Sequence, residues 1–188
     1  MPHPTAVRIT DAALEVLGAG GLHALSHTRV DATAGLPTGS TSNHFRTRAA
    51  LVTATVARLR QIDAENFQAR LAAGLPASLD ELIDAYAAFV DDATGPSRAR
   101  TVARYVIFIQ GVVEPALLEQ LNADRRLLAD WTAAALTAVG APAGIASTLL
   151  AAVEGLILHR LTDFTTGPAG PDVRRLVTGL TGHGEHHP

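Results

Sequence analysis

The chain contains no cysteine and no lysine, and only 4% of its residues are aromatic. Without cysteine, it cannot form a disulfide scaffold, a thiolate zinc site, an iron–sulfur cluster or a cysteine nucleophile. Because all 15 cationic side chains are arginine, lysine Schiff-base chemistry and a P-loop lysine are also excluded. The scarcity of aromatic residues means that the core must consist mainly of Ala, Leu and Val.

Long hydrophobic runs are scarce as well. The segment Met1–Asp11 has no apolar run of the length that a secretory signal peptide needs. Trp131–Val153 carries no charge and is long enough to cross a bilayer, but a Gly/Pro turn, Gly140–Gly144, interrupts it. We interpret this stretch as two buried helices joined by a turn, and we expect a cytoplasmic protein.

The chain has 188 residues, of which 47% are hydrophobic and 18% are charged. A chain of this length can bury a hydrophobic core without disulfides or structural metals. Charge is unevenly distributed. Residues 1–60 hold six arginines and three acids, whereas residues 61–188 hold nine arginines and fifteen acids. A basic head on an acidic body is typical of a polyanion-binding module joined to a partner-binding module, although chance also accounts for so small an excess.

Periodic apolar positions predict helices along the whole chain. The first contains Ile9 and Leu17 on one face and is expected to end at Gly18–Gly21, because glycine commonly terminates helices. Ser26 and Ser78 are predicted to cap later helices. The expected helices after the first cover residues 26–34, 38–45, 48–73, 78–94, 97–112, 115–139 and 143–165, and a last one contains Val173, Leu176, Val177 and Leu180. The predicted fold class is all-α, with about nine helices and no alternating strand pattern.

Residues 26–51 match a helix-turn-helix, because two short helices are joined by a glycine-containing turn. In that motif the second helix enters the major groove of DNA. Here it would present small hydroxyls and an amide, which donate and accept without crowding the groove, and Asn43 can pair with adenine. Arginine suits phosphate contacts at the junction that follows. The candidate DNA-binding residues are Thr28, Thr38, Gly39, Ser40, Thr41, Ser42, Asn43, His44, Arg46 and Arg48.

Four segments in order, Arg8-Ile-Thr-Asp-Ala-Ala-Leu14, Gly20-Gly-Leu22, Ala34-Gly-Leu-Pro-Thr-Gly-Ser-Thr-Ser-Asn-His-Phe45 and Arg48-Ala-Ala-Leu51, resemble the TetR family of transcriptional regulators. The resemblance implies a bacterial repressor without a cofactor. Its first three helices would bind palindromic operator DNA, and a small-molecule effector would release it. The expected domains are a DNA-binding domain at 1–47, a ligand-binding and dimerisation domain at 48–182 and a disordered tail at 183–188.

The resemblance also implies roles for single residues. Arg48 takes the place of a basic residue that contacts a phosphate, while Phe45 and Leu51 resemble packing residues. Ser42 stands where the family often has a tyrosine, and Asp31 stands where a small residue is frequent. His44 has two possible roles. It either packs or caps at the end of its helix, or it contacts a DNA phosphate when its imidazole ring is protonated.

The apolar stripe of helix 143–165 is wider than one core face, which favours a second, partner-facing surface over a fully buried central helix. The resemblance implies that the last two helices of each subunit form a four-helix bundle in a homodimer. His159 fits either this contact or the ligand pocket. The candidate interface residues are Leu149, Val153, Leu156, Leu161, Leu176 and Leu180.

Large side chains among small ones are candidates for a ligand pocket, although each also fits a plain core position. Arg104 would suit an anionic effector, or it could pair with an acid at the surface. The candidate pocket residues are Tyr86, Phe89, Arg104, Tyr105, Phe108 and Trp131.

The tail has the histidines for a metal site, His183, His186 and His187, but it follows the last predicted helix, so we expect no metal there. His-Glu-x-x-His, paired Glu-x-x-His and serine-elbow motifs are absent from the sequence. These absences argue against the alternative hypothesis, an all-α enzyme or small-molecule carrier that does not bind DNA.

Overall fold

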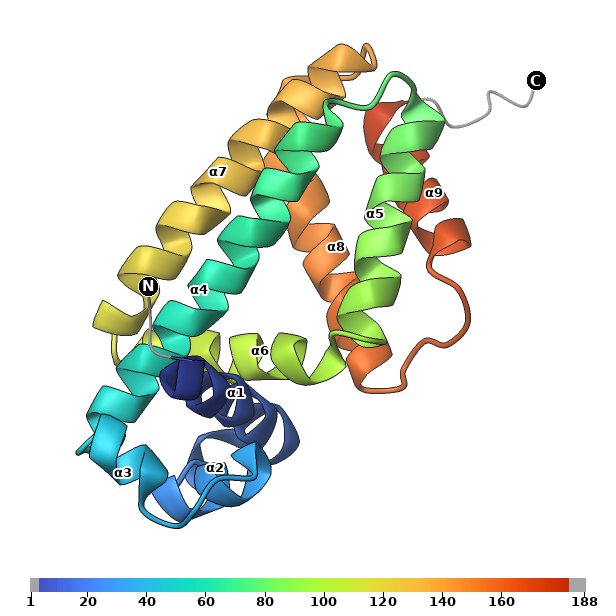
Figure 1. Ribbon diagram of the computed structural model, residues 1–188. Helices are drawn as coiled ribbons and strands as arrows, with labels where there is room; N and C mark the ends of the chain where they lie inside the picture. The colour runs from blue at the N-terminus through green and yellow to red at the C-terminus, as the bar shows by residue number, and fades with distance from the viewer. Residues whose placement is uncertain (1–3, 183–188) are drawn as a thin grey trace. The chain divides into compact units, whose positions relative to one another are not determined.

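The computed structural model describes residues 4–182, apart from the side chain of Gln120, and these residues form helices and no strands (Figure 1). The predicted all-α fold class is therefore confirmed. The tail histidines lie outside the described residues. The helices are α1 (Pro4–Ala24), α2 (His27–Ala34), α3 (Ser40–His44), α4 (Arg48–Ala73), α5 (Leu79–Thr94), α6 (Arg98–Val113), α7 (Ala116–Ala138), the short 3₁₀ helix η1 (Ala143–Ile145), α8 (Ala146–Leu161) and α9 (Gly170–Thr181).

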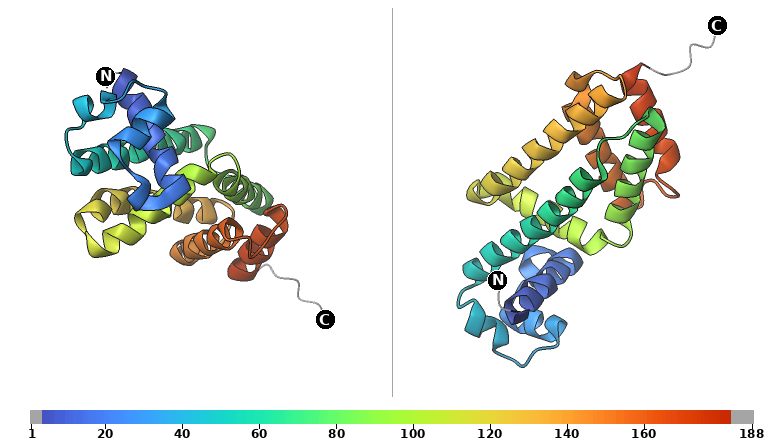
Figure 2. Two further views of the ribbon diagram at one scale, coloured as in Figure 1. Left: turned by 90° about the horizontal axis from the view of Figure 1, so that it is seen from below. Right: turned by 45° about the horizontal axis from the view of Figure 1, so that its top comes forward.

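Contacts divide the described chain into two compact units. The first unit comprises the chain up to Asn66 together with Arg98–Asp124, and in it α1 packs on α2 and α6 while α3 packs on α2. The second unit comprises Phe67–Ser97 and the chain from Arg125 onward, and in it α5 packs on both α8 and α9. Figure 2 shows α8 and α9, in orange and red, side by side. The domain boundaries expected from the sequence stay predictions.

Several helix ends lie where local signals predict them. The Ser26 hydroxyl oxygen accepts a hydrogen bond from the Arg29 amide at 3.3 Å, and Gly35, with φ 61°, ends α2. At α5 the Ser78 hydroxyl caps the Glu81 amide at 3.2 Å, while the Glu81 carboxylate accepts from the Ala77 amide at 2.8 Å. The Ser78 bond satisfies a first-turn amide that an uncapped helix would leave free, and the Glu81 bond ties the residue before the cap to the same turn.

The first helix does not end at Gly18 as predicted. It continues through Gly20, kinks at Gly21, where φ is 67°, and reaches Ala24. The physical reason is packing: a Cβ on Gly18 would lie 2.2 Å from the backbone oxygen of Ala99 in α6. Gly18 therefore allows two helix backbones to approach each other, and it does not act as a terminator.

Two other helices are shorter than predicted. Helix α3 begins at Ser40 because Gly39 precedes it with a left-handed φ of 96°. Helix α8 ends at Leu161 instead of residue 165, because Thr162 leaves the helical conformation and Asp163 has φ 57°. Phe164, which falls within the predicted helix 143–165, lies on the turn beyond the observed helix and is 76% exposed.

The uncharged stretch is divided as predicted, since α7 ends at Ala138 and Gly140, with φ 76°, begins the turn to η1. Among the described residues, Ala143–Leu161 is long and apolar enough to cross a membrane, with mean hydropathy 1.3. This is weak evidence, because helices in the cores of soluble proteins meet the same criterion.

Candidate functional site

The N-terminus of α3 is held by a carboxylate from the preceding helix. Asp31, in α2, is only 3% exposed and accepts hydrogen bonds from two backbone amides, that of Gly39 at 2.8 Å and that of Thr41 at 2.7 Å. Gly39 carries the positive φ that this turn requires, and Asp31 supplies the cap that glycine lacks. The orientation of α3 relative to α2 therefore depends on one buried side chain.

The environment of Asp31 favours its charged form. Burial by itself raises the pKa of this carboxyl group, but the hydrogen bonds from Thr41 and Gly39 and the charge of His27 outweigh it, so the pKa is lowered from its usual 3.8. The anion also lies at the positive end of the α3 dipole. The sequence marked Asp31 only as a departure from a family pattern and did not predict its capping role.

Two further side chains connect neighbouring elements: His27 joins α2 to the end of α3, and Arg48 joins the start of α4 to the end of α1 and the residue after it. The His27 Nε2 atom lies 2.7 Å from the Phe45 carbonyl oxygen, which joins the start of α2 to the end of α3. Arg48, at the start of α4, donates through Nε to the Leu25 carbonyl at 3.3 Å and through Nη2 to the Leu22 carbonyl at 2.6 Å. Much of the hydrogen-bonding capacity of Arg48 is thus used within the protein.

The surface of α3 is polar and small. Ser42, Asn43 and His44 are exposed, whereas the side chain of Thr41 is fully buried. The hydroxyls of Ser40 and Ser42 donate to the carbonyls of Pro37 and Gly39, at 2.6 and 2.9 Å, which leaves their oxygen lone pairs available as acceptors. Of the other residues predicted to contact DNA, Gly39 and Ser40 are half-buried. The remaining ones are exposed: Thr28, Thr38, Arg46 and Arg48.

The wide stripe of α8 divides into two faces. Leu149 and Val153 are buried within the subunit, at 0% and 1% exposure, while Leu158 is 50% exposed. The remaining predicted interface residues are half-buried: Leu156, Leu161, Leu176 and Leu180. The exposed ring of the Phe164 side chain contacts His159 edge-on, with centroids 4.9 Å apart.

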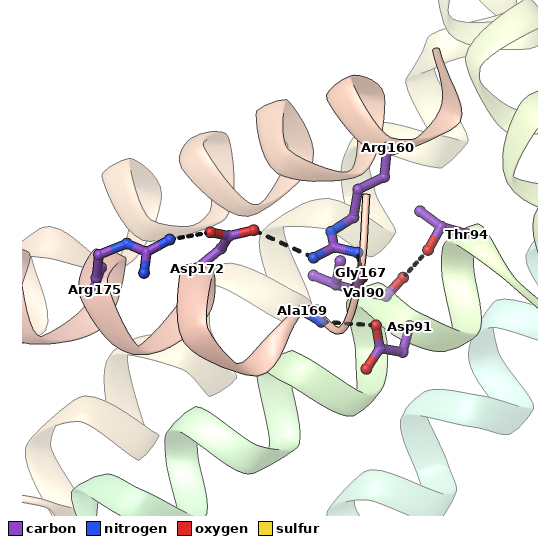
Figure 3. Close-up of polar contacts among 8 residues, drawn as sticks. All are labelled: Val90, Asp91, Thr94, Arg160, Gly167, Ala169, Asp172 and Arg175. Carbon is purple, nitrogen blue, oxygen red and sulfur yellow. Dashed lines mark hydrogen bonds and ion pairs between the residues drawn. The ribbon is translucent and has the colours of Figure 1, made fainter. Parts of the chain in front are cut away.

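A polar cluster fixes the connection between α8 and α9 (Figure 3). The guanidinium of Arg160, a residue 9% exposed, donates to the Gly167 carbonyl and to the Asp172 carboxylate, the latter at 3.2 Å. Asp91, in α5, accepts from the Ala169 amide at 3.0 Å. These contacts anchor the start of α9 to both α8 and α5, which positions the two helices that the sequence assigned to the dimer.

The second unit contains an apolar cavity of about 420 Å³ between the end of α4 and the middle of α7. Trp131 is the predicted pocket residue that lines it. The cavity rim carries exposed leucines, which a soluble protein rarely leaves uncovered in one place. The full lining consists of Phe67, Leu71, Gly74, Leu75, Leu127, Trp131 and Ala134.

Arg70 contacts one lining residue of this cavity, Trp131, and the sequence did not single it out. Its guanidinium carbon is 4.9 Å from the centroid of the Trp131 ring and 5.5 Å from that of the Phe89 ring. Burial lowers the pKa of Arg70 below its usual 12.5, while nearby Tyr86 acts in the opposite direction. No local pattern could have distinguished this arginine from the others, because its ring partners come from α5 and α7.

The other predicted pocket residues have different surroundings. Tyr86 is buried, its hydroxyl 2.7 Å from the Thr132 hydroxyl, and burial raises its pKa. Tyr105 and Phe108 are half-buried on α6 in the first unit, where Arg104 pairs with Asp63. Arg104 thus has the acidic partner that the sequence left open as an alternative to ligand binding.

The chain is similar in sequence and in fold to several solved protein structures. The chain shares 31% identity with a member of the TetR family from Streptomyces coelicolor A3, covering 95% of this chain and 99% of that one with a TM-score of 0.70. It shares 32% identity with the multidrug binding protein EbrR complexed with proflavin, covering 94% and 99% with a TM-score of 0.59. The ethidium complex of EbrR gives 27% identity, 94% and 98% coverage and a TM-score of 0.66. No curated protein matches.

The family model described as "Tetracyclin repressor-like, C-terminal domain" matches residues 77–183, more than half of the chain. The family model therefore matches the C-terminal part of the chain, where no family motif was recognised in the sequence. The segments that resemble the family in sequence lie elsewhere, in residues 8–51. Together with the helical architecture and the structural relatives, the match establishes that the chain belongs to the TetR family of transcriptional regulators.

Proposed function

We propose that this transcriptional regulator is a repressor that binds a palindromic operator as a homodimer and is released by a small-molecule effector in the bacterial cytoplasm. As a member of a regulator family, it is not an enzyme. The observation that carries the proposal is the capped α3 helix, whose exposed Ser42, Asn43 and His44 are of the size and polarity that base-edge contacts require.

In this proposal the DNA contacts have two kinds of source. Exposed arginines and backbone amides bind phosphates and set affinity, whereas α3 side chains read bases and set sequence preference. A dimer would make every DNA contact twice, so the few positive charges of residues 1–60 would be sufficient for DNA binding. The half-exposed face of α8, with Leu158, supports the assignment of α8 and α9 to the subunit interface.

The cavity beside Trp131 is proposed as the effector site. It has the size and apolar lining that small-molecule sites share. EbrR, a relative of this chain, is complexed with the planar aromatic dyes proflavin and ethidium. By analogy, the rings of Phe67 and Trp131 would contact a flat ligand here.

Selection of DNA from a random library with the purified protein tests the operator, followed by affinity measurements against salt. A palindromic winner with a log–log slope of about −5 to −9, corresponding to roughly 6–10 phosphate contacts, is expected of a dimer. If no sequence is enriched even after the protein has been refolded to strip ligand, the alternative of a small-molecule-binding protein without DNA function is favoured.

Arg46 offers the cleanest test of a phosphate contact. It is exposed, and within residues 4–182 its side chain makes no hydrogen bond or ion pair, in contrast to Arg48. Arg46→Ala should weaken binding to all sequences and reduce the magnitude of the salt slope by about 2, since a dimer loses two contacts of about 0.9 each. Arg126→Ala, at an exposed arginine of the second unit, is the matched control and should change neither quantity.

A further inference from the structure

Arg70 differs from four other arginines that are buried or half-buried in this protein. Each of those four pairs with an aspartate: Arg58 with Asp11, Arg60 with Asp124, Arg104 with Asp63 and Arg160 with Asp172. Arg70 is half-buried, yet among residues 4–182 no carboxylate forms an ion pair or hydrogen bond with it. Since withdrawing a cation from water is costly without a partner, this position calls for an anion that the chain itself does not supply.

The neighbours of Arg70 leave its charge uncompensated. Phe89 and Trp131 offer ring faces, which attract a cation but do not neutralise it. The buried Tyr86 is neutral at physiological pH, because burial raises its pKa. The Thr132 hydroxyl donates to the Leu128 carbonyl at 2.8 Å, so the Tyr86 proton is used in the bond to Thr132. Arg70, whose guanidinium lies against the Trp131 ring of the cavity lining, is therefore a charged donor without a carboxylate partner next to that lining.

We propose that the effector is a small aromatic carboxylate, whose ring occupies the cavity beside Phe67 and Trp131 and whose anionic group pairs with Arg70. This inference rests on the proposed function of the cavity as the effector site and assigns it a charge. A guanidinium matches a carboxylate with two parallel hydrogen bonds, which gives orientation as well as affinity. Proflavin and ethidium, the ligands complexed with EbrR, are cations at neutral pH, so the two proteins would differ in the charge of the ligand that they accept.

The structure provides its own reporter, because Trp131 is the single tryptophan of the chain. Its fluorescence, excited where tyrosine does not absorb, reports directly on the cavity. The probes are benzoate, phenylbutyrate and biphenylacetate, each compared with its neutral amide and its ammonium counterpart, with calorimetry as a second measurement of affinity. We expect at least one carboxylate to bind about ten- to a hundredfold more tightly than its amide, and more tightly still than its ammonium form.

Substitution tests whether Arg70 is the cause. Arg70→Met keeps the apolar stem and should abolish the preference for the carboxylate, while Arg70→Lys keeps the charge and should retain part of it. Arg126→Met removes an exposed arginine next to Leu127 of the lining and should leave the preference unchanged. Circular dichroism and thermal melting of each variant separate loss of binding from loss of folding.

The outcomes distinguish this inference from the proposed function, because operator affinity is measured separately on ligand-free protein. Equal or tighter binding of the ammonium probes, an unchanged preference in Arg70→Met, or no response to any probe would overturn the assignment of an anionic effector even if the operator is bound. A carboxylate preference that depends on Arg70, in a protein that selects no operator, would support the anionic ligand site at Arg70 but refute the repressor, and with it the role of that ligand as an effector.

Discussion

Removing the Asp31 carboxylate should loosen α3 within the first unit. The side chain accepts two amide hydrogen bonds, at 2.8 and 2.7 Å, from a position that is 3% exposed. Hydrogen bonds to a charged group contribute about 1.5–3 kcal/mol each, and loss of an N-cap alone costs about 0.5–2 kcal/mol. Since water reaches part of the freed Gly39 amide, we expect Asp31→Ala to lower the free energy of unfolding by about 3 kcal/mol. Asp31→Asn, which keeps one acceptor, should cost about half as much.

The assay is urea denaturation followed by circular dichroism, combined with operator affinity. Asp84→Asn, at an exposed aspartate of α5, is the control and should be close to neutral. The destabilised variants should also bind the operator more weakly, since α3 is no longer held at its first turn. A loss below about 1 kcal/mol in Asp31→Ala would refute the reasoning that the cap carries this stability.

The same contacts predict a pH dependence with a definite sign. Because the folded protein lowers the pKa of Asp31 below 3.8, its contribution is complete above that value. The contribution is lost as the pH falls through the lower, folded-state pKa. The difference in stability between the parent and Asp31→Asn should therefore be constant near neutral pH and shrink in acid below pH 3.8. A difference that grows on acidification would contradict this assignment.

Three further substitutions test other parts of the protein. Asn43→Ala should change which operator is selected without destabilising the fold, and each lost bidentate base contact is worth about 1–3 kcal/mol of discrimination. Arg160→Met should lower the free energy of unfolding by about 2–3 kcal/mol, measured by urea denaturation, because it removes the buried link between Gly167 and Asp172. Leu158→Glu should shift the proposed dimer to monomer in analytical ultracentrifugation, since it places a charge on the exposed face of α8.

Local signals in the sequence determined much of the helical framework. The hydroxyls of Ser26 and Ser78 begin helices where predicted, and α4 has the predicted bounds from Arg48 to Ala73. Such features depend on caps, turns and apolar periodicity within a few residues, so they can be read without knowledge of the remaining chain. The helix-turn-helix belongs to the same class, because its turn geometry is encoded in Gly35 and Gly39.

Only the tertiary structure decided the roles of residues whose partners lie far away in sequence. Gly18 appeared to end a helix, but the approach of Ala99 makes it a packing position. Asp31 caps α3 because α2 turns its buried face toward that helix. Arg104 and Arg70 are both arginines, yet one meets Asp63 and the other meets two aromatic rings. The sequence specifies which charges exist, whereas the packing of distant helices determines which of them meet a carboxylate and which meet an aromatic ring.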